Sequence, residues 1–294
     1  MAHIQANGLQ LAYEIFPARA PQRCVPLILV RGLGSQMVQW PQAFIDSFRH
    51  AGMDVVIFDN RDIGQSEKLD AAGVPDLSAL AAGLRAGSSF PVPYGLDDMA
   101  NDVVGLMDGL GIEKANVFGM SLGGMVVQHL AFSHRTRFEH IVCVMSASGN
   151  RDMPMPRAAD VAPPDVEDIE AVTAHLVGNY KENMSPAYPT PEAEMQRVAA
   201  LCAPRYYPAG IVRQIAASMS DGSRVERLQQ VDMPFLVVHG LEDALIPPVC
   251  GEEIAALVPN AQYLPVPGMG HDIGQGIEAV LQPEICRFLG LPTS

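Results

Sequence analysis

Short apolar runs alternate with longer amphipathic stretches through the first half of the chain. Two of the amphipathic stretches, Trp40–Ala51 and Leu96–Leu110, have the apolar spacing of helices, and the second begins with acidic residues that suit a helix N-terminus. The apolar runs predict buried strands at Val25–Val30, Val55–Phe58, Asn116–Gly119 and His140–Met145. Strands and helices in alternation predict a mostly parallel sheet with helices on both faces.

This alternation stops near Gly149. Residues 149–228 lack strand-like runs and are rich in Pro, Met, Ala and charged residues. Afterwards the pattern returns with strands at Phe235–His239 and near Gln262–Leu264, and with helices near Val249–Leu257 and Ile277–Leu289. We therefore expect an α/β core domain of residues 1–148 and 229–294, and a helical cap of residues 149–228 inserted after the sixth strand. An insertion there covers the carboxyl ends of the strands, where ligands bind, which favours a lid over a surface elaboration.

A second irregular stretch, Leu69–Gly95, contains Ala-rich helical sequence, and we expect it to fold beside the cap.

Composition narrows the function classes. Of the 294 residues, 48% are hydrophobic and 18% charged, enough for a full core. A net charge of −14 disfavours nucleic acid and anionic membranes as partners. No apolar run could span a bilayer, and residues 1–20 lack the apolar stretch of a signal peptide, so we expect a cytoplasmic protein. The five scattered cysteines predict neither disulfides nor a structural metal.

A Gly-x-Ser-x-Gly motif stands between a predicted strand and a predicted helix. Gly119–Gly123 follows the apolar run that ends at Phe118 and precedes helical sequence at Met125–Ser133. A chain that turns this sharply needs small residues on both sides of the serine. The turn exposes the serine hydroxyl and places the N–H of Leu122 at a helix N-terminus, where it can stabilise an oxyanion. Ser121 is therefore the predicted nucleophile, with a plain tight turn as the alternative.

The acid and the base follow in the chain order serine, acid, histidine. Asp243 lies just past the predicted strand Phe235–His239, where its carboxylate can accept an imidazole N–H. Glu242 is a rival acid, and a simple Asx turn is the structural alternative for Asp243. His271, in a Gly-rich loop before the last helix, is the one histidine after the acid and is the predicted base.

A second oxyanion donor is expected in the segment Arg31–Ser35, which follows the first predicted strand. Gly32 and Gly34 would let the backbone approach a substrate oxygen, so the N–H of Leu33 is the candidate partner of the Leu122 N–H. A glycine turn without function is the alternative.

The loop after Val55–Phe58 is dense in charge. We expect Asp59 and Arg61 to play a structural part there, by pairing with each other to brace the loop.

At these positions the chain resembles the α/β-hydrolase superfamily over nearly its whole length outside the cap. Asp59–Ser66 combined with Gly119–Gly124 looks most like the branch that holds aclacinomycin methylesterases and small bacterial carboxylesterases. The sequence departs from the family pattern at Arg31, where relatives usually carry His. That departure leaves the reaction class intact and puts transfer of a relative's substrate preference in doubt.

The resemblance implies a serine hydrolase that cleaves a carboxylic ester through an acyl-enzyme, with no cofactor and no metal. Met and Tyr residues of the cap favour a small-molecule ester with an apolar acyl or aryl part. Within the same fold, a carbon–carbon bond hydrolase and a cofactor-free haloperoxidase or perhydrolase remain alternatives. A non-catalytic protein that binds a small ligand is a remote one. The oligomeric state is not predicted.

Overall fold

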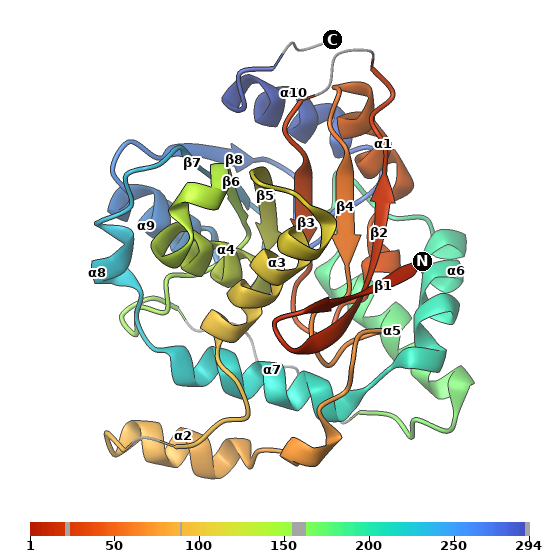
Figure 1. Cartoon of the computed structure of the whole chain (residues 1–294). Helices are drawn as coiled ribbons and strands as arrows, with labels where there is room; N and C mark the ends of the chain where they lie inside the picture. Colours follow the sequence, from red (N-terminus) through yellow and green to blue (C-terminus); the bar gives the residue numbers. More distant parts are fainter. Residues whose placement is uncertain (21–23, 89, 155–162, 292–294) are drawn as a thin grey trace.

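A single mixed sheet forms the centre of the molecule (Figure 1). The computed structural model describes residues 1–20, 24–88, 90–154 and 163–291, and in this part of the chain the strand order is β1-β2-β4-β3-β5-β6-β7-β8. The pairs β1–β2 and β2–β4 are antiparallel and the others parallel, which confirms the predicted sheet type. The strands are β1 Ala2–Ala6, β2 Leu9–Phe16, β3 Leu27–Val30, β4 Val55–Phe58, β5 Ala115–Met120, β6 Phe138–Val144, β7 Phe235–Gly240 and β8 Gln262–Val266.

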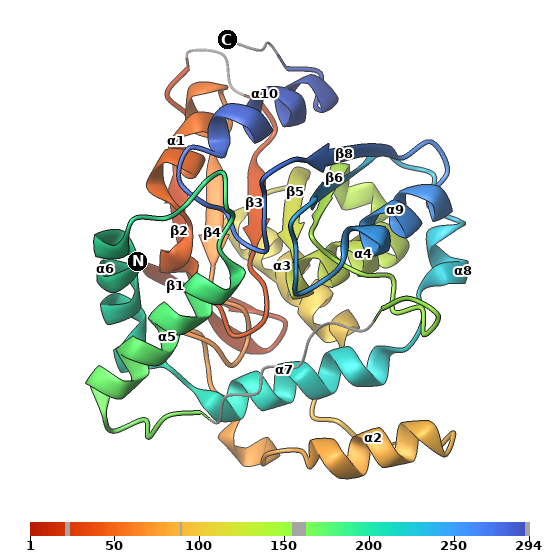
Figure 2. The same ribbon diagram turned by 180° about the vertical axis from the view of Figure 1, so that it is seen from behind.

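Helices cover both faces of this sheet, as Figures 1 and 2 show from opposite sides. One face carries α1 (Gln42–His50) and α10 (Glu278–Phe288). The other carries α3 (Leu96–Leu110), α4 (Leu122–Ser133) and α9 (Pro248–Leu257). Successive residues of the inner strands enter the hydrophobic cores on opposite faces of the sheet. The sequence of each inner strand is therefore apolar throughout and does not alternate between apolar and polar residues.

An N-terminal hairpin, β1–β2, extends the sheet at one edge and is absent from the sequence-based prediction. Its turn is formed by Asn7 (φ 49°) and Gly8 (φ 78°), the left-handed pair that tight hairpins favour. The Asn7 side chain also donates to the Asp102 carboxylate over 3.0 Å, which fixes the turn against α3.

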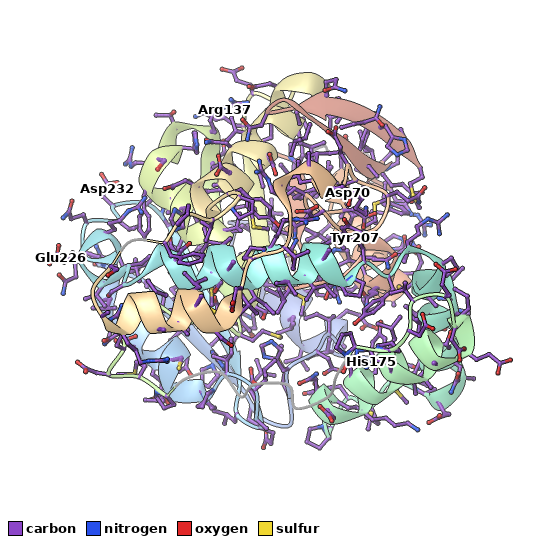
Figure 3. All side chains as sticks on the ribbon, turned by 90° about the horizontal axis from the view of Figure 1, so that it is seen from below. Asp70, Arg137, His175, Tyr207, Glu226 and Asp232 are labelled. Carbon is purple, nitrogen blue, oxygen red and sulfur yellow. The ribbon has the colours of Figure 1, made fainter. Side chains whose placement is uncertain are left out.

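Between β6 and β7 the chain forms a group of helices, here called the insertion. They are α5 Ile169–Asn183, α6 Glu192–Cys202, α7 Pro208–Asp221 and α8 Val225–Leu228. Figures 1 and 2 show α5, α6 and α7 at one end of the sheet. Helix α2 (Leu77–Arg85) lies along α7, seen from below in Figure 3, which places the stretch before α3 beside the insertion as expected. Residues 155–162 of the expected cap lie outside the described residues.

Short 3-10 helices complete the architecture. They are η1 Met37–Gln39, η2 Asp70–Ala72, η3 Arg135–Arg137 and η4 Ala203–Arg205. No helix in the described ranges is long and apolar enough to cross a membrane.

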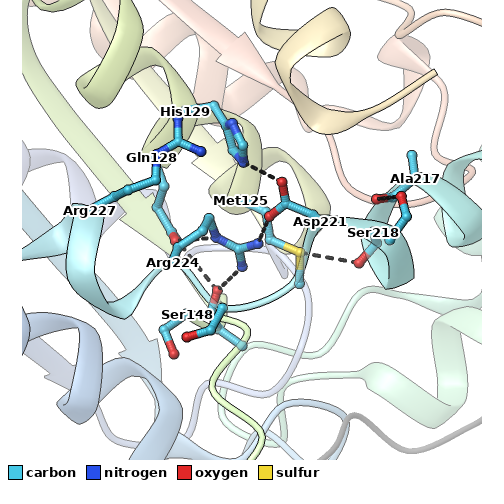
Figure 4. A network of polar contacts seen from close by, with 12 residues as sticks. Met125, Gln128, His129, Ser148, Ala217, Ser218, Asp221, Arg224 and Arg227 are labelled. Carbon is cyan, nitrogen blue, oxygen red and sulfur yellow. Dashed lines mark hydrogen bonds and ion pairs between the residues drawn. The ribbon is translucent and has the colours of Figure 1, made fainter. Parts of the chain in front are cut away.

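A buried polar network joins the end of the insertion to α4 (Figure 4). The guanidinium of Arg224 donates to the side chain of Gln128 over 2.8 Å and contacts the Asp221 carboxylate. The same carboxylate lies 2.9 Å from Nε2 of His129, a fully buried residue of α4. Because these groups are buried, their contacts fix where the insertion rejoins the core.

Candidate active site

Ser121 occupies the sharp turn between β5 and α4. Its backbone has φ 55° and ψ −120°, a conformation that costs a non-glycine residue roughly 1–3 kcal/mol. The glycine at 119 is required because a Cβ there would lie 2.2 Å from the Gly123 carbonyl oxygen. The glycine at 123 is required as well, because its Cβ would lie 2.3 Å from the Val30 carbonyl oxygen. The motif thus forms the strained turn that holds a serine at the end of a strand.

Asp243 is a buried carboxylate that is held on both oxygens. Oδ1 accepts the backbone N–H groups of Leu245 and Ile246, each over 2.9 Å. Oδ2 lies 2.7 Å from Nδ1 of His271. Burial alone would raise the pKa of this carboxyl, but hydrogen bonds from His239 and His271 hold it at about 2. Asp243 is therefore ionised at neutral pH and fixes the orientation of the His271 ring.

His271 lies in the loop after β8, here called the histidine loop (Pro267–Ile273). With Nδ1 donating to Asp243, the free lone pair of the imidazole is on Nε2. Nε2 is buried and has no hydrogen-bond partner among residues 1–20, 24–88, 90–154 and 163–291. The ring nitrogen that a general base needs is thus uncommitted.

The insertion holds the histidine loop in place. The backbone N–H of His271 donates to the carbonyl of Asn183 over 2.9 Å. Ser185, which is fully buried, accepts the N–H of Gly270 over 2.9 Å and donates its own N–H and hydroxyl to the Asp272 carboxylate. His271 is therefore positioned by residues of the insertion as well as by the core.

The loop Arg31–Ser35, here called the oxyanion loop after its predicted role, passes directly beside the serine. A Cβ on Gly32 would lie 3.0 Å from Cβ and 3.5 Å from Oγ of Ser121. The N–H of Leu33 makes no hydrogen bond within the part of the chain that the structure describes. Leu122 is the first residue of α4, where the N–H has no carbonyl within the helix to bond. Two free backbone donors thus flank Ser121.

Helix α7 supports the oxyanion loop from the side of the insertion. The Gln214 side chain, fully buried, accepts the N–H of Gly34 over 3.0 Å and donates to the carbonyl of Arg61 over 3.1 Å. A Cβ on Gly34 would lie 3.0 Å from the Ile211 side chain. These contacts fix the residue next to the Leu33 N–H.

The charged loop after β4 is structural, but its expected internal pair is wrong. Asp59 accepts the backbone N–H of Met37 over 2.6 Å and that of Gln65 over 2.7 Å, and it does not pair with Arg61. Arg61 instead forms two bonds to Asp102 of α3, over 2.6 and 2.7 Å. Each oxygen of Asp59 thus accepts one backbone N–H, from η1 and from its own loop, while Arg61 reaches a carboxylate on α3.

Two further residues, Glu242 and His239, lie near Asp243. Glu242, the rival acid, accepts the backbone N–H of Gly268 over 2.6 Å, so it binds the histidine loop at another point than the imidazole. His239, which the sequence analysis did not single out, is fully buried and brings Nε2 to 3.4 Å from Asp243 Oδ2 and to 2.9 Å from the Ile246 carbonyl. Its position four residues before the acid, at the end of β7, was the available signal.

In the described ranges, no group of three or more His, Cys, Asp or Glu side chains is placed to hold a metal ion. All five cysteines are free thiols.

Comparison with known proteins places this geometry in a family. Residues 25–274 match the family described as alpha/beta hydrolase fold. The rhodomycin D methylesterase DnrP of Streptomyces peucetius is 24% identical over 285 residues, which cover 89% of each chain. A meta-cleavage product hydrolase from Pseudomonas fluorescens IP01 shares the fold with a TM-score of 0.69 at 18% identity, covering 99% of this chain and 97% of that one. An enol-lactonase from Burkholderia xenovorans LB400 does so with a TM-score of 0.67 at 20% identity, covering 98% of this chain and all of that one. The chain belongs to the alpha/beta hydrolase family.

Proposed function

We propose that the protein is a serine hydrolase that cleaves a carboxylic ester, with Ser121 as nucleophile, His271 as base and Asp243 as the acid that orients the base. One observation carries this proposal. The Asp243–His271 pair is buried and leaves Nε2 uncommitted, while a strained turn presents a serine in the same family fold. The methylesterase relative supports ester cleavage as the reaction.

In the proposed reaction, His271 Nε2 takes the proton of the Ser121 hydroxyl as Oγ attacks the ester carbonyl carbon. The tetrahedral intermediate collapses when the imidazolium protonates the alkoxide, which leaves as an alcohol. Water then attacks the acyl-enzyme with His271 again as base, and the carboxylic acid is released. The ionised Asp243 stabilises the imidazolium in both halves.

The N–H groups of Leu33 and Leu122 are the proposed oxyanion hole. Gly32 touches Ser121 without a side chain between them, so a substrate carbonyl at the serine lies next to the oxyanion loop. Two such donors stabilise the negative charge that develops on the carbonyl oxygen.

We further propose that the insertion, within residues 149–228, acts as a lid and supplies the surface for an apolar acyl or aryl group. Ile211 of α7 lies against Gly34 of the oxyanion loop, and Tyr180 of α5 hydrogen-bonds Gln39 of η1 over 3.2 Å. These contacts support a role for α5 and α7 next to the bound ester.

The test uses wild type, Ser121→Ala and Ser133→Ala on p-nitrophenyl esters from acetate to decanoate. Ser133 is an exposed serine at the far end of α4 and is the matched control. We expect Ser121→Ala to lose roughly four or more orders of magnitude in kcat and the control to keep wild-type turnover. Labelling of Ser121 by a fluorophosphonate, identified by peptide mass spectrometry, reports the nucleophile without turnover.

A fully active Ser121→Ala would show that the nucleophile is misassigned. A wild type that reacts with the fluorophosphonate but hydrolyses no ester would direct the search to carbon–carbon bond cleavage or to peracid formation. A wild type inert in both assays would favour a binding protein.

A further inference from the structure

Four arginines are buried in the part of the chain that the structure describes, and three of them have carboxylate partners. Arg61 pairs with Asp102 at 2.6 Å, Arg213 with Asp62 at 2.8 Å, and Arg224 contacts Asp221. Arg31 is 7% exposed and forms no ion pair and no side-chain hydrogen bond within residues 1–20, 24–88, 90–154 and 163–291. It is thus the exception among the buried guanidinium groups.

Arg31 stands at the junction of the proposed catalytic groups. It is the first residue of the oxyanion loop and precedes Gly32, which touches Ser121. Its guanidinium lies over the Trp40 ring, 4.7 Å from the centroid, and its Nε is enclosed without a partner. Tyr180 of α5, Cys202 of α6 and Asp272 of the histidine loop lie within electrostatic range. The cation therefore lies where the core, the insertion and the histidine loop meet.

The nearby Asp272 carboxylate lies within electrostatic range of this cation but forms no ion pair with it. Oδ1 of Asp272 accepts two hydrogen bonds from Ser185, whereas Oδ2 is buried and has no hydrogen-bond partner in the described residues. Burial raises the pKa of the Asp272 carboxyl. Burial lowers the pKa of Arg31, but a guanidinium remains protonated in proteins. A buried guanidinium without an ion pair is costly, so this position favours an anionic ligand.

We propose that Arg31 binds a carboxylate carried by the substrate, so that the preferred esters are half-esters of dicarboxylic acids or similar esters with a free acid group. This proposal rests on the proposed function, because it places the carboxylate beside Ser121. A planar guanidinium matches a carboxylate with two parallel hydrogen bonds. A doubly charged phosphate fits less well than a singly charged carboxylate, because the net charge of −14 opposes the larger charge more strongly.

The experiment measures binding without turnover, in the Ser121→Ala background. Isothermal titration calorimetry compares monomethyl malonate, succinate, glutarate and adipate with neutral methyl esters of matched chain length. We expect one half-ester to bind about 10- to 100-fold more tightly than its neutral counterpart, as for other buried charge-assisted pairs. Added Arg31→Met removes that preference, whereas added Arg31→Lys keeps part of it. The optimal chain length reports the span between Ser121 and Arg31.

Equal binding of half-esters and neutral esters overturns the proposal. This comparison uses no Arg31 variant, so it remains valid even if the Arg31 variants do not fold. A preference that persists in folded Arg31→Met overturns it too, because another cation would then be responsible. Circular dichroism checks the fold of each variant. Turnover of the neutral p-nitrophenyl esters is the separate test of the proposed function. Hydrolysis without a preference for half-esters would support the proposed esterase and contradict the carboxylate site at Arg31. Arg31-dependent binding without hydrolysis would support the carboxylate site and contradict the proposed esterase.

Discussion

Gln214 is the residue through which helix α7 controls the oxyanion loop, and its replacement is the sharpest test of that coupling. The side chain is fully buried and uses both ends of its amide, as acceptor for the Gly34 N–H and as donor to the Arg61 carbonyl. Gln214→Leu keeps the approximate volume and leaves both backbone groups without a partner. Each unpaired buried group costs about 1–3 kcal/mol, and Gly34 is partly exposed, so we expect a loss of about 2–4 kcal/mol in unfolding free energy.

The same change loosens the residue that follows Leu33. Complete removal of an oxyanion donor costs about 10²- to 10³-fold in kcat, and a donor that is only misaligned costs less. We therefore expect kcat to fall by about 10- to 100-fold with a smaller change in KM, because the lost interaction belongs to the transition state. Gln214→Glu keeps an acceptor for the Gly34 N–H, so its kcat should lie between those of wild type and Gln214→Leu.

The assay combines urea unfolding with steady-state hydrolysis of one p-nitrophenyl ester at a temperature where every variant is folded. Gln196→Leu, on the exposed face of α6, is the control for the change in side-chain chemistry. A folded Gln214→Leu with kcat within about twofold of wild type would refute the argument that α7 positions the loop, whatever its stability.

Three further predictions concern the supports of the site. Asp243→Asn should lower kcat by about 10⁴-fold. The pKa of Asp243 in the folded protein is held at about 2, below its unfolded value, so the ionised carboxylate contributes about 2 kcal/mol to the free energy of unfolding. This contribution is complete above pH 4–5 and is lost as the pH falls toward 2. Urea titrations across that range should therefore show a smaller pH dependence of stability in Asp243→Asn than in wild type. Ser185→Ala removes two hydrogen bonds to the histidine loop and should lower kcat about 10-fold. If kcat and the pH–rate profile are both unchanged in this variant, Ser185 does not position His271. Arg213→Met leaves Asp62 buried without its partner and should cost about 3–5 kcal/mol in thermal unfolding, with Arg197→Met on the surface as control.

Much of the core follows from short-range pattern. The strand Val55–Phe58 and the helix Leu96–Leu110 have the predicted bounds. The first is a fully apolar run between polar loops, and the second is an amphipathic stretch with clear end signals, so the local sequence determines the type and the ends of each. The hairpin Ala2–Phe16 was missed because its outer strand faces solvent and lacks a clear alternation. Its signal was the Asn7–Gly8 dipeptide, which only a tight left-handed turn explains.

The candidate site was predictable at the ends of strands and not beyond them. Residues at 121, 243 and 271 follow β5, β7 and β8, so the topology of a parallel sheet brings their loops to one edge. The contacts of Ser185 and Gln214 depend on how the insertion packs, and no short pattern encodes contacts between segments that are 85 and 180 residues apart. The same reason explains the wrong Asp59–Arg61 pair, since Arg61 found its partner on α3.

The anchoring of the histidine loop has a consequence for engineering. Exchange of caps between relatives is an obvious route to new substrate ranges, and residues 149–228 would be the natural cassette. In this protein that cassette would carry away the Asn183 carbonyl and the Ser185 hydroxyl, which hold the loop of His271. A graft that preserves residues 183–188 keeps these contacts to the histidine loop, whereas one that replaces them would alter the position of His271 together with the surface of the cap.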